Sequence, residues 1–216
     1  MFKVPFFLRR PWILLRDAFL DRDQPNLTRL REIQNPEAFL WAILPHAART
    51  FSACIAMLPA RQARAAAVGY LYCRILDTYE DLHPNPEKRE QVLRGFGERL
   101  RNPPFHTAPP VPKDTNYGNR DLSHLLLVDR CHLVDQVFLT LPEEQKNAIR
   151  ELVSNMAEGM AWASQRFREQ KGALVGEDQL LQYCRHVLGN PVLFSIRLMQ
   201  GKPASPEQAM DALKVG

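Results

Sequence analysis

Two aspartates and one arginine occur at helical spacing near the middle of the 216-residue chain. If residues 61–82 form a helix, Asp77 and Asp81 lie one turn apart on one face, with Arg74 a turn earlier and Glu80 beside the pair. Carboxylates this close repel one another and are costly to bury without a positive partner. Mg²⁺ suits them because it takes oxygen ligands and completes its shell with water and phosphate oxygens. Arg74 adds a planar fork that fits phosphate.

The helix over residues 61–82 is indicated by composition and periodicity. Three consecutive alanines at 65–67 have high helical propensity, and Leu71, Ile75 and Leu82 recur near helical spacing. The alternative to a metal and phosphate site is a solvated charged turn at the end of this helix. For an isolated pair of aspartates that alternative is the commoner one, because surface ion pairs are frequent and weak.

The composition indicates one globular domain covering residues 1–216, since 45% of the chain is hydrophobic. The 28 lysines and arginines exceed the 24 acidic residues by only four, so charge does not indicate a nucleic-acid partner. The four cysteines are scattered, as is typical of thiols in a reducing compartment, and no apolar run is long enough to span a bilayer. We therefore expect a cytoplasmic protein of undetermined oligomeric state.

No segment alternates with the two-residue period of a strand, so the expected fold is all-α. The N-terminal segment, residues 1–34, contains an amphipathic stretch in which Trp12, Leu15 and Phe19 oppose charged side chains. Such a segment either packs on the body of the protein or lies on a membrane surface, which leaves peripheral membrane contact open.

The remaining elements follow from caps, prolines and apolar periodicity. We expect helices over residues 36–45, 46–58, 61–82, 87–100, 121–139 and 142–167, then from 177 and from 205 onward. Five prolines make residues 102–119 a loop, and Pro191 should kink the helix that contains it. Gly159 lies inside a helix, which indicates either close contact with another helix or room for a ligand.

Several short motifs occur in a characteristic order. They are Arg49-Thr50-Phe51, Leu58-Pro59, residues 74–81 (RILDTYED), residues 158–161 (EGMA) and residues 183–189 (YCRHVLG). Together they resemble the squalene/phytoene synthase family over residues 35–199, and residues 77–81 resemble the squalene synthase form most.

The resemblance implies a helical bundle of the isoprenoid synthase type and head-to-head joining of two prenyl diphosphates. It implies Mg²⁺ held by Asp77, Glu80 and Asp81, with Arg49 and Arg74 on the diphosphate oxygens. Tyr183 is then expected beside the reacting carbons, as a catalytic residue together with Asp77 and Asp81. Squalene synthases also use NADPH to reduce the intermediate, so this cofactor is a further implication.

One departure from the family concerns a second aspartate-rich helix. The family has one after the helix that begins near Ser205, and no DxxxD follows Tyr183 here. We therefore expect a bundle that is C-terminally incomplete, as in a truncated chain, a fragmentary gene product or an inactive relative. Farnesyl diphosphate is the first expected substrate and geranylgeranyl diphosphate, as in phytoene synthesis, the second. A non-catalytic assembly factor or a lipid-binding module are the alternatives.

Overall fold

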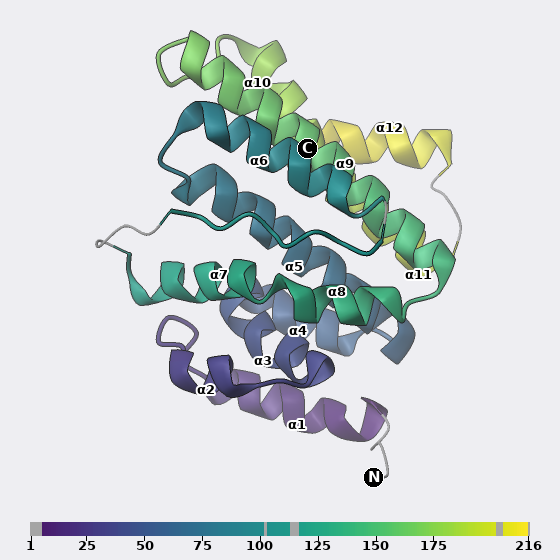
Figure 1. The fold of residues 1–216 in the computed structure, drawn as a ribbon. Coiled ribbons are helices and arrows are strands. Elements are labelled where there is room, and N and C mark those ends of the chain that lie inside the picture. Colours follow the sequence, from purple (N-terminus) through teal and green to yellow (C-terminus); the bar gives the residue numbers. More distant parts are fainter. Residues whose placement is uncertain (1–5, 102, 113–116, 202–204, 216) are drawn as a thin grey trace.

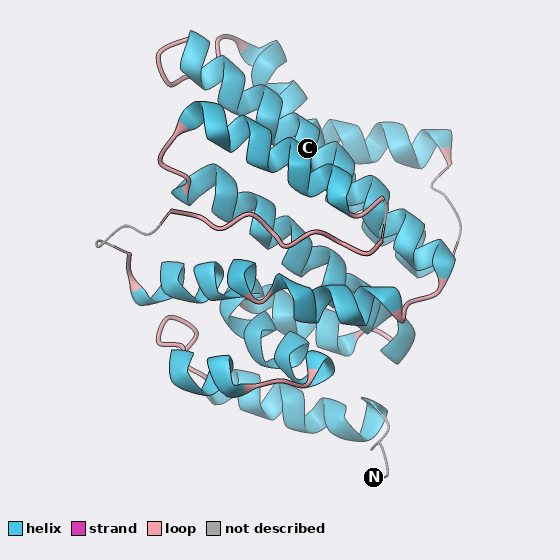
Figure 2. Cartoon of the chain, viewed as in Figure 1, coloured by secondary structure: helices cyan, strands magenta, loops and turns pink. Residues whose placement is uncertain are grey.

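The computed structural model describes residues 6–101, 103–112, 117–201 and 205–215, and every regular element among them is helical (Figure 1 and Figure 2). The all-α prediction is confirmed. The first elements are α1 (Phe6–Phe19), α2 (Leu27–Glu32), α3 (Pro36–Ala48), α4 (Thr50–Met57), α5 (Ala60–Leu82) and α6 (Pro86–Arg99). They are followed by α7 (Asn119–Asp129), α8 (Cys131–Leu139), α9 (Glu143–Glu169), α10 (Glu177–Cys184), η1 (Arg185–Gly189), α11 (Asn190–Gln200) and α12 (Pro206–Val215).

The helix α5 runs through the middle of the molecule and packs against seven others: α3, α4, α6, α7, α8, α9 and α11 (Figure 1). Its small residues at 63 and 65–67 and its large residues Leu71, Tyr72 and Ile75 are buried, so both faces of the helix are covered. The ends of the molecule in Figure 1 are formed by α1 and α2 on one side and by α10 and α12 on the other. The central position of α5 lets its last turns contribute to a site bounded by several helices.

The predicted break at Pro45 is wrong, because α3 continues through this proline to Ala48. Pro45 has no N–H to donate to the carbonyl of Trp41, one turn earlier. In the structure Nη2 of Arg16 donates to that carbonyl at 2.9 Å. The chain instead changes direction at Arg49, whose φ of 50° ends α3 and begins α4.

The helix predicted over residues 121–139 is two helices, α7 and α8, separated at Arg130. The backbone of Arg130 leaves the helical region at φ −107° and ψ 19°, and Nη2 of this arginine donates to the carbonyl of Ile33 at 2.6 Å. The expected kink at Pro191 takes the form of the π-turn η1 immediately before α11. The helices predicted near residues 61–82, 87–100, 142–167 and 205 onward are confirmed to within a few residues.

The proline-rich segment connects α6 and α7, and its residues 102 and 113–116 lie outside the described residues. Its described parts, residues 103–112 and 117–118, contain no helix. It runs alongside α5 and α8 in Figure 1 as an extended strap. Its carbonyls accept hydrogen bonds from buried donors, because Oη of Tyr79 donates to Pro109 at 2.7 Å and Nε of Arg99 donates to His106 at 3.0 Å. The described part of the loop is therefore packed into the fold.

None of the described helices combines the length and the apolar character needed to cross a membrane. Cys54, Cys73, Cys131 and Cys184 are all free thiols, as the sequence predicts. Residues 1–5 of the predicted N-terminal segment lie outside the described residues.

Candidate functional site

A cavity of about 580 Å³ lies against the C-terminal half of α5 and is bounded by α4, α9, η1 and α11. This volume is within the range of ligand sites for small organic molecules. Most of its lining is apolar: Phe51, Ile55, Leu58, Leu152, Met156, Met160, Val187, Leu188, Phe194, Leu198 and Met199 belong to it. Arg74 and Asp77 are the only charged residues that line it within the described part of the chain.

Arg74 is held in place by its neighbours on α3 and α5. Its Nε donates to the carbonyl of Ala47 at 3.1 Å, its Nη2 donates to Oη of Tyr70 at 3.2 Å, and its Nη1 lies 3.2 Å from a carboxylate oxygen of Asp77. These partners come from the end of α3 and from both neighbouring turns of α5. The guanidinium is therefore oriented before any ligand binds, which lowers the ordering cost of recognising an anion.

Asp77 is mostly buried beside this arginine, and Asp81 follows one turn later and is exposed. Burial raises the pKa of Asp77 to about 6, the charge of Arg74 opposes the shift, and the charge of Asp81 adds to it. A carboxylate that is partly desolvated next to a second carboxylate favours the approach of a cation. Arg74 supplies part of that positive charge.

Tyr183 contacts Glu80, which lies in the last turns of α5 together with Asp77 and Asp81. Its Oη donates to both carboxylate oxygens of Glu80, at 3.0 and 3.2 Å. Burial raises the pKa of Glu80 to about 7, the hydrogen bond from Tyr183 opposes the shift, and Asp77 and Asp81 add to it. The pKa of Tyr183 is also raised, by burial and by the charge of Glu80, so the phenol keeps its proton at neutral pH. The structure therefore joins two predicted residues that are 103 positions apart.

The position of Tyr183 depends on the turn that follows it. The π-turn η1 packs directly on α9, where a Cβ placed on Gly159 would lie only 2.1 Å from Cβ of His186. Nδ1 of the same histidine lies 3.1 Å from the carbonyl of Asn155 on α9. Of the two interpretations of Gly159, close helix contact is the one that the structure supports.

Arg49 lies outside the lining of the cavity. It follows Ala47, the acceptor of Arg74, by two residues, but its exposed guanidinium lies 3.7 Å from a carboxylate oxygen of Asp23. Its contact with diphosphate stays a prediction.

The predicted metal ligands do not form a closed cage. No three His, Cys, Asp or Glu side chains converge on a common point among the residues that the structure describes, and Glu80 is bonded to Tyr183. Mg²⁺ in phosphate-binding sites commonly takes only one or two protein carboxylates, with water and phosphate oxygens in the remaining positions. Asp77, with its raised pKa, and Asp81 one turn later fit that pattern.

Sequence reasoning missed Tyr70 and Cys73, which line the cavity beside Arg74. Tyr70 had a detectable signal, because it precedes Arg74 by four residues and so shares its helix face. Cys73 had none, since a single cysteine in a helix is usually a core residue.

Comparison with known proteins gives a consistent result. The profile described as squalene/phytoene synthase matches residues 44–215. Squalene synthase 1 of Arabidopsis thaliana is 29% identical over 152 residues, which is 70% of this chain and 33% of that protein. Lycopaoctaene synthase of Botryococcus braunii is 32% identical over 132 residues, 60% of this chain and 28% of that protein. Inactive squalene synthase 2 of Arabidopsis thaliana is 30% identical over 125 residues, 57% of this chain and 28% of that protein.

Among solved structures, TcSQS in complex with the ligand BPH1237 superposes with a TM-score of 0.62 at 22% identity. The match covers 82% of this chain and 48% of the other. It shows that the fold is shared. The matched region spans about a third or less of the curated relatives and about half of the solved chain.

Proposed function

The chain belongs to the squalene/phytoene synthase family, and from this premise we propose that it binds a prenyl diphosphate for head-to-head condensation with a second one. The observation that carries the proposal is the cavity, whose long apolar lining meets one arginine and one carboxylate on α5. A prenyl diphosphate has the same division, with a hydrocarbon chain and a compact anion. Farnesyl diphosphate is the proposed substrate.

The chemistry begins when the allylic C–O bond breaks and the diphosphate leaves with the bonding electrons. Arg74 can donate hydrogen bonds to the departing oxygens, because its other partners already fix its plane. Asp77 and Asp81 would hold Mg²⁺, which when bound neutralises charge on the diphosphate. The apolar walls keep water from the allylic cation.

Tyr183 is the residue proposed to act nearest the reacting carbons. It lines the cavity, and its Oη donates to Glu80. In this role the phenol can relay a proton, giving the one at Oη to a reacting group as it takes one from Glu80, while its ring steadies nearby positive charge. Glu80 therefore orients Tyr183, and its assignment as a third metal ligand is weaker than that of Asp77 and Asp81.

A binding measurement tests the substrate and metal assignments together. Farnesyl thiodiphosphate, which ionises slowly, should bind in the presence of Mg²⁺ and at least about tenfold more weakly without it. The variant Asp77→Asn with Asp81→Asn should lose this Mg²⁺-dependent gain. Asp178→Asn, which changes an exposed aspartate of α10, should keep it. Equal binding by the double variant and the unmodified chain would overturn the metal assignment.

A second candidate, ligand binding without condensation, is favoured by a specific observation. The cavity lining includes one arginine and one carboxylate, whereas joining two prenyl diphosphates requires two anions to be held. Incubation with farnesyl or geranylgeranyl diphosphate, each with and without NADPH, separates the candidates. Presqualene diphosphate, squalene or phytoene as a product supports condensation, and identifies the substrate and the use of NADPH. Tight binding with no product supports the second candidate.

A further inference from the structure

The helix α1 turns a row of large apolar side chains toward solvent. Leu8, Trp12, Leu15 and Phe19 follow one another at intervals of four, three and four residues, which places them on one face. They are 59%, 74%, 50% and 84% exposed. We call these four residues the α1 stripe. A contiguous row of this kind is unusual on a soluble surface and marks an interaction site.

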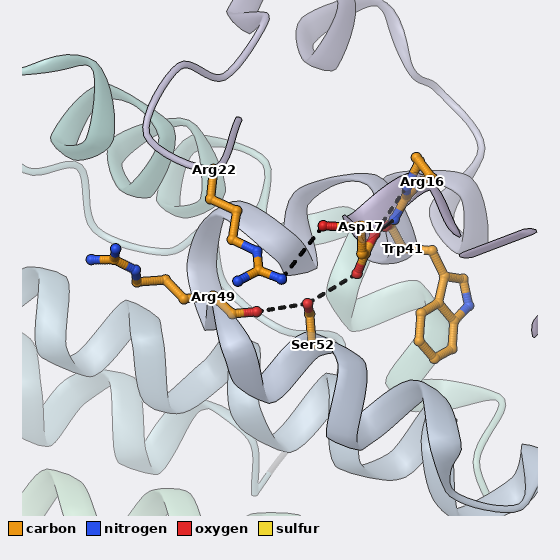
Figure 3. Close-up of polar contacts among 6 residues, drawn as sticks. All are labelled: Arg16, Asp17, Arg22, Trp41, Arg49 and Ser52. Atoms are coloured by element: carbon orange, nitrogen blue, oxygen red, sulfur yellow. Dashed lines mark hydrogen bonds and ion pairs between the residues drawn. The ribbon is translucent and has the colours of Figure 1, made fainter. Parts of the chain in front are cut away.

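The contacts that hold α1 to the protein come from its opposite face. Asp17 is buried, and its Oδ2 accepts a hydrogen bond from Oγ of Ser52 on α4 at 2.9 Å (Figure 3). Oδ1 of the same carboxylate accepts from Arg16, which also donates to the carbonyl of Trp41. Ile13 is buried as well. The fold therefore anchors the helix through these residues and leaves the α1 stripe uncovered.

The charges of α1 select one kind of partner. Its sequence contains three arginines, at 9, 10 and 16, and a single acidic residue, Asp17, whose carboxylate is buried in the contacts just described. The sequence of the helix therefore carries a net positive charge and no exposed acidic group, although Arg16 pairs with Asp17 and Arg10 donates to the carbonyl of Leu58. Apolar and aromatic residues on one face together with arginines are the pattern of helices that lie at the surface of anionic membranes.

We propose that the α1 stripe binds the surface of an anionic phospholipid membrane. Trp12 and Phe19 enter the boundary between headgroups and acyl chains, while the helix axis lies in the membrane plane. The net positive charge of the helix attracts the anionic headgroups. In Figure 1 α1 forms an outer edge of the molecule, so a flat surface can reach it.

The membrane contact also bears on the cavity. The helix α1 packs on α4, and Nη2 of Arg10 donates to the carbonyl of Leu58 at 2.7 Å. Leu58 and Phe51 line the cavity, and Phe51 is itself exposed. If the cavity takes a hydrocarbon chain, as proposed above, the membrane bound by α1 lies next to the helix that forms one of its walls. The membrane contact itself does not depend on that function.

Vesicle flotation tests the proposal directly with the 216-residue chain. The protein should float with vesicles of phosphatidylcholine containing 30% phosphatidylglycerol, and at least about tenfold less with phosphatidylcholine alone. The variant Trp12→Gln with Phe19→Gln should lose on the order of tenfold or more in affinity for the anionic vesicles. The matched control is Val175→Gln with Leu180→Gln, which changes exposed apolar residues at the other end of the molecule and should bind unchanged.

A second readout locates the contact at Trp12. Brominated acyl chains in the anionic vesicles should quench part of the tryptophan fluorescence, and Trp12→Phe should remove that part while still floating. Because Trp12 and Phe19 are exposed, the far-ultraviolet circular dichroism and the melting temperature of the variants at these two positions should equal those of the unmodified chain. Equal flotation by the stripe variant and the control would overturn the proposal. So would a concentration-dependent dimer, without vesicles, that the stripe variant alone abolishes, since the α1 stripe would then bind a second copy.

Discussion

Gly159 allows the π-turn that follows Tyr183 to lie against α9. The π-turn places His186 where the first atom of any side chain at position 159 would have to be, and the two Cβ positions would be 2.1 Å apart. Tyr183 lies three residues before His186, so its distance to Glu80 is set partly by this contact. The absence of a side chain at Gly159 thus helps to set the position of Tyr183 in the site.

Replacing Gly159 by alanine should therefore destabilise the protein, although alanine favours helices. The helical gain is about 1 kcal/mol, whereas overpacking of this kind costs about 1–3 kcal/mol and should prevail, since it involves a backbone-proximal atom. Urea unfolding gives the difference. Gly95→Ala is the matched control, because a Cβ at this position in α6 meets nothing within 4 Å, and it should stabilise by about 0.5–1 kcal/mol. Equal stability of the two variants would contradict this account.

At the scale of elements, a residue of α1 supplies a hydrogen bond that α3 lacks at Pro45. Pro45 cannot donate to the carbonyl of Trp41, and Arg16 of α1 donates to it instead. The same arginine donates to Asp17, whose carboxylate also accepts from Ser52 of α4. Three helices, α1, α3 and α4, therefore meet at one small polar cluster (Figure 3).

A double-mutant cycle tests this dependence. Arg16→Ala should cost about 1 kcal/mol in the free energy of unfolding, since it removes the donor to Trp41. In a Pro45→Ala background the backbone N–H of residue 45 can donate to the same carbonyl, so the cost of Arg16→Ala should be smaller. A cost that is the same in both backgrounds would show that Arg16 acts only through Asp17. Unfolding in urea with tertiary and secondary probes measures all four proteins.

Local sequence signals predict most elements, and their failures have a common cause. Caps and periodicity place α5, α6, α9 and α12. The predicted helix break at Pro45 and the predicted continuous helix through Arg130 are both wrong. In both cases the deciding contact is distant in sequence: Arg16 lies 25 residues from Trp41, and Arg130 lies 97 residues from Ile33. The spacing of Arg74 and Asp77 predicted that they share one face of a helix, because this depends only on local structure, and in the structure the two form an ion pair.

At the scale of the whole molecule, a buried ion pair joins three helices and the strap. Nη2 of Arg99 on α6 lies 2.6 Å from a carboxylate oxygen of Asp135 on α8, and Oη of Tyr72 on α5 donates to the other oxygen at 2.8 Å. The Nε of the same arginine donates to the carbonyl of His106 in the strap.

Removing only one partner of this pair should be severe. Asp135→Leu leaves the guanidinium of Arg99 buried without its carboxylate and should cost about 3–5 kcal/mol. Arg99→Met together with Asp135→Leu should be less damaging than Asp135→Leu alone, because no uncompensated charge remains. Thermal unfolding of the two variants checks the order. If the double variant were the less stable, the pair would contribute to stability through its net attraction.

The shared hydrogen bond between α1 and α3 has a consequence for how this family changes over time. Proline at position 45 is tolerated while an arginine approaches from the N-terminal helix, so the two positions should covary among relatives. A lineage that discards the first twenty residues should also replace Pro45 with an amino acid that carries its own backbone donor. The same substitution is the one to introduce when the N-terminus is shortened for crystallisation.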